Sequence, residues 1–373
     1  MGAPAPQSTE LFTVGTDEAV ITFVTDANDT VTTRVGDHDV RTTGPQHVVR
    51  VTGLEPGTEY TLEVEGVPAG PYLPVSFRTL ERPSGRLLAT IATANDVHFG
   101  ETECGRLGPP HEEIGPLCRS ADGEPPYPET MNRAVVNEMS ALDPHAVVVK
   151  GDLTALGSDE EYAAFLAGYG VLGDRMHHVR GNHDAMIDPT LAMEDTPYVI
   201  ALDGVTLAVL DTVIPGTDRG RLGADQVQWL DDLGAESGVP ILVFGHHYLW
   251  DLEAETRSDT YFGINPDDSE AFADVVTRRD AIAGYFAGHT HRNRVRRFHS
   301  VRDVPFAEIA CTKDYPGAWA EYRVYEGGYT QVVRRVTEPA AFAWAEKTRM
   351  MYSGTYRDYA LGPLEHRCFT QPF

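Results

Sequence analysis

Five short clusters of metal-competent side chains follow one another between residues 95 and 291, and each comes directly after an apolar run that predicts a strand. The clusters are Asn95-Asp96-Val97-His98, Gly151-Asp152, Gly181-Asn182-His183-Asp184, Gly245-His246-His247 and Gly288-His289-Thr290-His291. Imidazole, carboxylate and amide groups are ligands that proteins offer to transition metals. Because the carboxyl ends of neighbouring strands converge in space, the series predicts one metal site assembled from all five clusters.

The spacing inside the clusters has a physical reason. Asp96 and His98, like His289 and His291, are two residues apart, so in extended backbone the side chains of each pair point the same way. The glycines that precede the ligands let the chain turn sharply and bring its backbone close to an ion. Each motif alone is typical of an ordinary turn or a surface pair, whereas the ordered series of five indicates a functional site.

The series resembles the calcineurin-like metallophosphoesterases, whose signature is DxH, GDx, GNHD, a histidine after a strand, and GHxH, in that order. The resemblance spans about residues 86–335. It implies that one metal is bound by Asp96, His98, Asp152 and His291. It implies that the second is bound by Asp152, Asn182, His246 and His289, with Asp152 bridging the two ions.

The donor set also bears on which metals fit. Four imidazoles, two carboxylates and one amide oxygen are too rich in nitrogen for Ca²⁺ or a dedicated Mg²⁺ site, and they suit two divalent or trivalent ions of Mn, Fe or Zn. Such a pair clamps phosphoryl oxygens and lowers the pKa of a bound water toward about 7. The expected chemistry is therefore hydrolysis of a phosphate ester by a hydroxide that bridges the metals.

The GNHD motif supplies the predicted catalytic residues. In the family that the sequence resembles, the histidine of this motif is not a ligand and lies beside the phosphate. The resemblance implies that His183 stabilises the transition state or protonates the leaving oxygen, and that Asp184 fixes its orientation. A turn or cap residue is the alternative for Asp184. Asn182, His183 and His247 are the predicted substrate contacts.

Sequence differences indicate the branch of the family. Purple acid phosphatases also carry a β-rich N-terminal domain, but they have glycine at the position of His98 and a tyrosine ligand where this chain has Ala155. The runs 150–157 and 287–293 look more like the class III cyclic nucleotide phosphodiesterase and glycerophosphodiesterase branch. That branch usually reads His-His-Pro, whereas Tyr248 follows His247 here, which leaves the shape of the pocket wall open.

This resemblance implies a small-molecule phosphodiesterase. A phosphomonoesterase with the same ligands is the alternative among enzymes, and a DNA-repair type of nuclease is disfavoured by charge. A non-catalytic metal-binding scaffold is the alternative from another class. Such scaffolds usually lack some of the ligands, and this sequence keeps them all.

The elements that must position the site fall into two patterns. Residues 1–80 hold short apolar runs separated by Gly, Pro and Asp turns, which predicts an all-β sandwich similar to fibronectin type III or to the purple acid phosphatase domain. After a linker at residues 81–85, residues 86–337 alternate strands with helices and predict a four-layer αββα sandwich. The predicted strands of this catalytic domain are residues 87–93, 146–149, 178–179, 207–210, 241–244 and 283–287.

Two further segments have open roles. Residues 338–373 form a tail rich in aromatic residues, which we expect to pack across the two domains, with a substrate lid as the alternative. A Gly/Pro-rich insertion at about residues 100–128 is either a loop over the site or a solvated excursion.

Composition excludes some partners. The net charge is 30 − 56 = −26 without a basic run, so nucleic acid and anionic membranes are not expected partners. The first ten residues lack the features of a signal peptide, which predicts a cytoplasmic protein unless a leader was removed. The oligomeric state stays open. The four cysteines form no CxxC pair and are expected to be free thiols, although Cys104 and Cys118 flank the insertion and would form a bridge in an exported protein.

Overall fold

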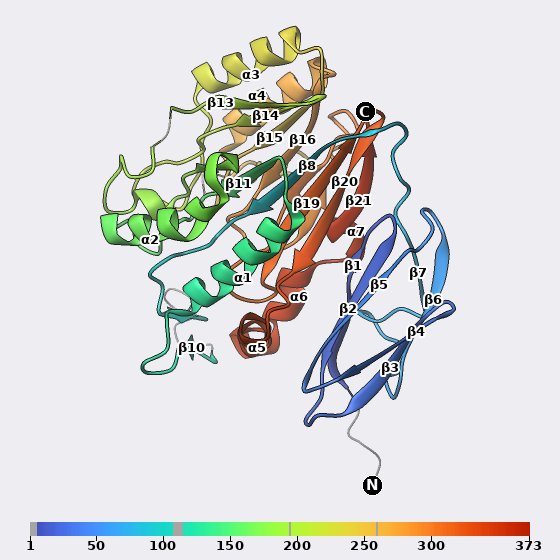
Figure 1. Cartoon of the computed structure of the whole chain (residues 1–373). Helices are drawn as coiled ribbons and strands as arrows, with labels where there is room; N and C mark the ends of the chain where they lie inside the picture. The colour runs from blue at the N-terminus through green and yellow to red at the C-terminus, as the bar shows by residue number, and fades with distance from the viewer. Residues whose placement is uncertain (1–5, 107–114, 194, 259) are drawn as a thin grey trace.

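The computed structural model describes residues 6–106, 115–193, 195–258 and 260–373. Two six-stranded mixed sheets face each other in the larger part of the chain, and a smaller all-β region lies beside one of them (Figure 1). Apolar side chains from both sheets, such as Ile91, Val148, Leu242 and Phe286, fill the space between them.

The first sheet combines parallel and antiparallel strands. Its order is β12 (Met176–Val179), β11 (Ala146–Lys150), β8 (Leu87–Ala94), β19 (Ala318–Tyr325), β20 (Gly328–Arg335) and β21 (Cys368–Pro372). The three strands β8, β11 and β12 are parallel, and the other three continue the sheet in antiparallel pairs. The predicted strands at residues 87–93, 146–149 and 178–179 are confirmed, and each extends by one or two residues.

The second sheet carries the later ligand loops. Its order is β13 (Tyr198–Leu202), β14 (Val205–Val209), β15 (Ile241–Phe244), β16 (Ile282–Ala287), β18 (Phe306–Glu308) and β17 (Arg294–Arg296). The three remaining predicted strands correspond to β14, β15 and β16. The residues of β15 are all apolar and buried because a strand in the middle of a covered sheet has no solvated face.

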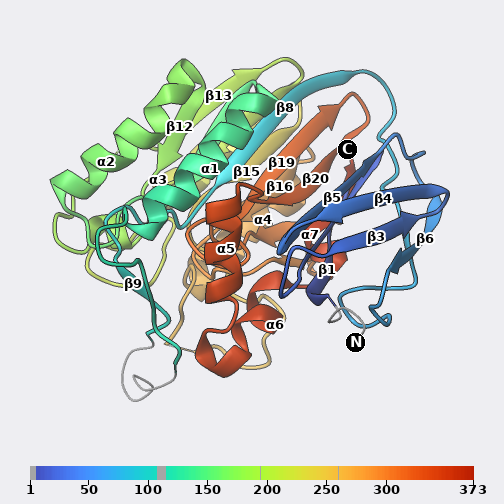
Figure 2. The same ribbon diagram turned by 60° about the horizontal axis from the view of Figure 1, so that its bottom comes forward.

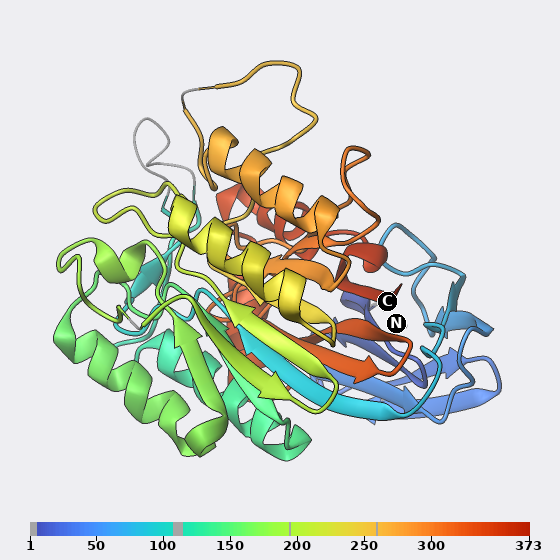
Figure 3. The ribbon, with the colours of Figure 1, turned by 90° about the horizontal axis from the view of Figure 1, so that it is seen from above.

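Helices cover the outer face of each sheet. On the first sheet lie α1 (Tyr127–Leu142), α2 (Asp159–Tyr169) and α5 (Pro339–Thr348) (Figure 2). On the second lie α3 (Ala224–Glu236) and α4 (Pro266–Arg278) (Figure 3). The predicted αββα sandwich is therefore confirmed. Helix α2 starts at a capping box in which Ser158 and Glu161 each accept from the other's backbone N–H, and this fixes where the chain leaves the loop after Asp152.

The N-terminal region consists of two antiparallel sheets around their own core. One has the order β1 (Gln7–Val14), β2 (Glu18–Val24) and β5 (Gln46–Thr52), and the other β4 (His38–Thr43), β3 (Thr30–Val35), β6 (Glu59–Val64) and β7 (Ser76–Arg78). The predicted all-β architecture is confirmed. The Tyr60 hydroxyl accepts a hydrogen bond from the Glu55 N–H at 2.9 Å, the backbone contact of a tyrosine corner. Kinship with fibronectin type III stays a prediction.

The C-terminal tail forms α5, α6 (Tyr356–Leu361), α7 (Leu364–Arg367) and β21. Strand β21 pairs with β20 and so completes the first sheet, while Arg367 donates to the carbonyl of Phe12 at 2.9 Å. The tail thus packs across both regions, as the sequence predicted.

The insertion begins with a short antiparallel pair, β9 (Glu103–Cys104) and β10 (Cys118–Arg119), which places Cys104 opposite Cys118. Both thiols are free and buried. A bridge between them in an exported protein stays the alternative. Residues 107–114, on which the role of the insertion depends, lie outside the described residues. Within the described ranges, no helix is long and apolar enough to span a bilayer.

Candidate metal centre

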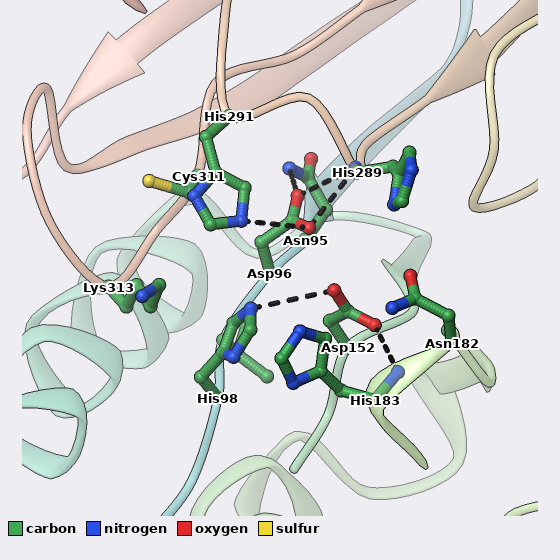
Figure 4. A network of polar contacts seen from close by, with 12 residues as sticks. Asn95, Asp96, His98, Asp152, Asn182, His183, His289, His291, Cys311 and Lys313 are labelled. Atoms are coloured by element: carbon green, nitrogen blue, oxygen red, sulfur yellow. Dashed lines mark hydrogen bonds and ion pairs between the residues drawn. The ribbon is translucent and has the colours of Figure 1, made fainter. Parts of the chain in front are cut away.

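The structure brings the seven predicted metal ligands together at the carboxyl ends of the strands. Figure 4 labels all of them except His246. His98 Nε2 lies 3.5 Å from Asp152 Oδ2, and His246 Nε2 lies 3.3 Å from Asp152 Oδ1. Asn182 Oδ1 is 3.1 Å from His246 Nε2. Asp152 therefore stands between the two ligand groups, as a bridging ligand must.

The remaining ligands complete the two groups. His291 Nε2 lies 3.4 Å from Asp96 Oδ1, and the ring centroids of His289 and His246 are 5.0 Å apart. Potential ligand atoms of Asp96, His98, Asp152 and His291 all lie within 4.8 Å of one another, as do those of His246, His247 and His289. His247 in this second group was not a predicted ligand.

The backbone at the ligands is strained. Five of the seven have a positive φ although none is glycine: Asp96 (51°), His98 (45°), Asp152 (49°), His289 (69°) and His291 (55°). Residues other than glycine rarely adopt this left-handed backbone conformation. Those that do gather at active sites, where the surrounding structure enforces the strained conformation. The five strained ligands therefore mark the loops as functional.

Close packing between the loops explains the glycines of the motifs. A Cβ atom at Gly181 would lie 2.2 Å from Asp152 Oδ1, and one at Gly288 would lie 2.7 Å from Asp96 Oδ2. The N–H groups of Val97 and His98 both donate to the carbonyl of Asp152 at 2.9 Å. Substitution of either glycine would therefore push a carboxylate out of place.

The charges at this site fit bound cations. Asp96 and Asp152 are fully buried, and no described Lys or Arg forms an ion pair with either carboxylate. Nε2 of His98 and Nε2 of His247 are buried without a hydrogen-bond partner among the described residues. Buried carboxylates and ring nitrogens are costly unless paired or bound to a metal, so this donor set fits metal ions.

The two aspartates and the histidines shift each other's pKa. Burial alone would lower the pKa of His246, but the Asp152 carboxylate outweighs it and raises the pKa to about 9. Burial would raise the pKa of Asp152, yet His246 and other histidines hold it well below its usual range. Burial together with His246 lowers the pKa of His289 to about 3, although Asp152 and Asp96 act in the opposite direction.

Second partners orient the histidine rings. His246 Nδ1 lies 2.9 Å from the carbonyl of Lys150, which leaves Nε2 facing Asn182 and Asp152. His289 Nε2 lies 2.7 Å from the carbonyl of Phe262, which leaves Nδ1 for an ion. Backbone carbonyls that hold one ring nitrogen are the usual support of metal-binding histidines.

The two predicted catalytic residues have different surroundings. His183 lies at the cavity, with its Nδ1 2.6 Å from the carbonyl of Ala155. That carbonyl, not Asp184, holds the ring, which corrects the predicted part of Asp184. The Asp184 carboxylate instead accepts hydrogen bonds from the N–H groups of Gly181, Leu153 and Thr154, and burial raises its pKa to about 6. Asp184 thus ties the second ligand loop to the third.

A cavity of about 690 Å³ opens on the ligands. Its described lining is Asp152, Asn182, His183, Met186, Asp218, Phe262, His289, Thr290, His291, Tyr352, Thr355, Tyr356 and Tyr359. Of the predicted substrate contacts, Asn182 and His183 belong to this lining. His247 does not: it is fully buried, with Nδ1 2.8 Å from Thr212 Oγ1.

Sequence reasoning missed a group beside His291. Cys311 Sγ donates to Asp314 Oδ1 at 2.8 Å, and the Tyr356 hydroxyl donates to the same oxygen at 2.7 Å. His291, Cys311 and Asp314 have ligand atoms within 4.8 Å of one another. The available signal was the polar run Cys311-Thr312-Lys313-Asp314 shortly after β18, which repeats the strand-then-ligand order of the five clusters.

Comparison with known proteins agrees with this geometry. A model of the calcineurin-like phosphoesterase family matches residues 89–293, which is more than half of the chain and includes all five ligand clusters. The chain belongs to the calcineurin-like phosphoesterase family.

Individual relatives are distant. A protein of Synechococcus sp. named probable cyclic nucleotide phosphodiesterase is 28% identical over 43% of this chain and 62% of its own length. The glycerophosphodiester phosphodiesterase GpdQ of Enterobacter lignolyticus is 28% identical over 48% of this chain and 68% of its own. The chain therefore spans less than two thirds of the length of the Synechococcus protein and about two thirds of that of GpdQ. A dimetal phosphatase from Danio rerio has the same fold, with a TM-score of 0.53, 16% identity, and coverage of 68% of this chain and 98% of that one.

Proposed function

We propose that this protein is a dinuclear metal-dependent phosphodiesterase that hydrolyses diesters of small molecules, of the cyclic nucleotide or glycerophosphodiester type. The observation that carries the proposal is the cavity, which opens directly on the two ligand groups. The names of the relatives from Synechococcus and Enterobacter support the same class of substrate.

The seven predicted ligands would hold two ions. One would lie between Asp96, His98, Asp152 and His291, and the other between Asp152, Asn182, His246 and His289. When bound, the ions would supply Lewis-acid activation of water and of the phosphoryl oxygens. Mn, Fe and Zn fit the donor set.

His183 is the proposed proton donor to the leaving oxygen. The carbonyl of Ala155 accepts from Nδ1, so the second nitrogen of the ring is the one that can exchange a proton with a ligand in the cavity. The His183 N–H also donates to Asp152 Oδ1 at 2.9 Å, which ties the position of the ring to the bridging ligand. A positioned acid of this kind contributes about 10²- to 10⁴-fold to a rate.

The charges at the cavity act in two directions on the choice between a diester and a monoester. The described lining of the cavity contains no Lys or Arg, and it contains the exposed carboxylate of Asp218 besides the predicted ligands. A diester carries one negative charge and a monoester up to two, so Asp218 penalises the monoester more, whereas two bound cations would favour it. The names of the relatives are what favour the diester. The same ligands would serve a phosphomonoesterase, which is the second candidate.

The test compares kcat/KM for bis(p-nitrophenyl) phosphate and p-nitrophenyl phosphate with Mn²⁺ present, followed by cyclic AMP and glycerophosphodiesters. We expect the diester to be preferred. A tenfold preference for the monoester, about 1.4 kcal/mol in transition-state stabilisation, would assign the protein to the phosphatases instead. Two bound metals without turnover of either ester would favour the scaffold.

A further inference from the structure

Large apolar side chains gather around the mouth of the metal centre. Phe262 is 44% exposed, Tyr359 46% and Met186 38%, and all three line the same cavity. Single exposed apolar residues are normal on a protein surface, but several around one concave site indicate a ligand with a complementary apolar face.

The tail supplies one wall of this cavity. Tyr352, Thr355, Tyr356 and Tyr359 all belong to its lining, although they lie beyond residues 89–293 that match the family. The rings of Tyr356 and Tyr359 are stacked at 21°, and Tyr352 meets Tyr356 edge to face with centroids 5.4 Å apart. This wall thus lies outside the segment that matches the family model.

The wall is attached to the ligand loop. The Tyr359 hydroxyl donates to the carbonyl of Thr290 at 2.8 Å, and Thr290 stands between the ligands His289 and His291. The guanidinium of Arg292 lies over the Tyr359 ring, 5.4 Å from its centroid. The aromatic face is therefore held at a fixed position relative to the predicted metal ligands.

The N-terminal region contacts helix α6, which carries Tyr359, from the other side. Arg357 Nε donates to Glu10 Oε1 at 2.9 Å, and its guanidinium lies 3.5 Å from the centroid of the Tyr72 ring. The Tyr72 hydroxyl donates to Asp358. Helix α6 is thus fixed between the all-β region and the ligand loop, and this gives the N-terminal region a part in shaping the cavity.

We propose that the tail wall, residues 352–359, together with Phe262 selects phosphodiesters whose alcohol part carries a flat aromatic or heteroaromatic ring. This inference rests on the proposed phosphodiesterase function and narrows its substrate class. A flat ring can pack on the exposed parts of Tyr359 and Phe262, whereas a glycerol substituent would leave them without an apolar partner. The single charge of the diester faces the ligands while its ring faces the wall.

The test measures binding to the Mn²⁺-loaded protein by calorimetry with two probes of equal charge, 2-naphthyl methylphosphonate and ethyl methylphosphonate. We expect the naphthyl probe to bind at least about tenfold more tightly, a difference of about 1.4 kcal/mol. Tyr359→Leu and Phe262→Leu should each remove most of this preference.

Two control variants separate stacking from structure. Tyr359→Phe loses the hydrogen bond to Thr290 but keeps the ring, so it should keep the preference. Phe373→Leu alters a side chain that is 45% exposed and lies outside the described cavity lining. This variant should also keep the preference for the naphthyl probe. Metal content is measured on each variant, so that only folded, loaded proteins are compared.

The outcomes distinguish this inference from the proposed function. If the wild-type protein turns over diesters but binds both probes within about threefold, the proposed role of the tail wall is contradicted and the phosphodiesterase function stands. The same holds if the preference for the naphthyl probe survives both Leu substitutions. If the protein prefers the naphthyl probe through Tyr359 and Phe262 but hydrolyses no diester, the role of the tail wall is supported and the proposed phosphodiesterase function is contradicted.

Discussion

Glu10 and Asp152 are both buried carboxylates, and the molecule surrounds them in opposite ways. Glu10, in β1, receives Arg357 Nε at 2.9 Å, Arg335 Nη1 at 3.4 Å and the Tyr315 hydroxyl at 2.8 Å, and it also pairs with Arg349. The partners of Asp152 are histidines and a backbone N–H.

The difference separates a structural cluster from a binding site. Around Glu10 the permanent guanidinium charges come from β20 and the tail, so the cluster is neutralised by the protein itself and joins three parts of the chain. Around Asp152 the histidines bear positive charge only when protonated, and Nε2 of His98 has no hydrogen-bond partner among the described residues. A buried cluster of this kind, whose cationic partners are histidines alone, fits ions from solution, because a buried charge is costly unless it is paired or bound to a metal.

The largest expected effect comes from Asp152→Ala. This change removes the only ligand predicted to be shared by both ions, so binding of the metal pair should be lost and turnover should fall by at least about 10³-fold. In metal-free buffer the free energy of unfolding should fall, because Asp152 then pairs with His246, whose pKa it raises to about 9, and the change leaves that buried ring without its partner. Elemental analysis, kinetics and urea denaturation measure the three quantities. Retention of two metals per chain would contradict the bridging role.

A different result is expected for Glu10→Gln, which should destabilise the protein and leave metal binding unchanged. Removing this charge leaves three arginines without their common partner, which should lower the free energy of unfolding by about 3–5 kcal/mol, with or without metal. Denaturant titration with and without a chelator checks this, and metal content should remain at the wild-type level. A loss below about 1 kcal/mol would show that the arginines find other partners.

The ligand loops could be predicted because their information is local. Each ligand follows its own apolar strand within a few residues, so the order and spacing of motifs specify both the strand ends and the site. The capping box of Ser158 and Glu161 and the turn before Tyr60 are local in the same sense.

The tail wall could not be predicted in this way. Tyr359 reaches the cavity because β21 pairs with β20 and because Arg357 meets Glu10, 347 positions away in the sequence. Strands β19 and β20 were also hidden, since buried charged residues such as Glu321 and Arg334 interrupt their apolar pattern. These residues pair with each other, and Arg334 pairs with Glu18 of the N-terminal region, so their burial depends on a contact that no local pattern reveals.

A smaller effect is expected at His183, which borders the metal centre without belonging to its predicted ligands. His183→Ala should keep both metals and lower kcat by about 10²-fold or more, because the proton donor to the leaving oxygen is lost. Kinetics and elemental analysis on the same preparation separate this variant from Asp152→Ala. Unchanged turnover would remove His183 from the mechanism.

The smallest effect concerns His178 in β12, a buried histidine that belongs to neither cluster. Its Nε2 lies 2.9 Å from the Tyr162 hydroxyl, and its ring packs edge to face on Phe165. Burial, with a smaller contribution from His177, lowers its pKa to about 4, whereas Asp152 raises that of His246 to about 9. The pKa of the buried His178 is thus lowered, and the pKa of the buried His246, which lies beside the Asp152 carboxylate, is raised.

The sign of the resulting pH dependence follows from the lowered pKa. Between pH 4 and the ordinary value near 6.5, the unfolded chain binds a proton at His178 that the folded chain does not, so stability falls as the pH falls through this window. The contribution of His178 is complete above pH 6.5 and amounts to about 2 kcal/mol, on the scale of about 1.4 kcal/mol per pKa unit with allowance for its burial. His178→Gln keeps an acceptor for Tyr162 but does not titrate there. Urea denaturation of both proteins in a chelator at pH 7 and pH 4.5 should therefore show wild type losing about 2 kcal/mol more than the variant, and equal losses would mean that His178 is protonated in the folded protein.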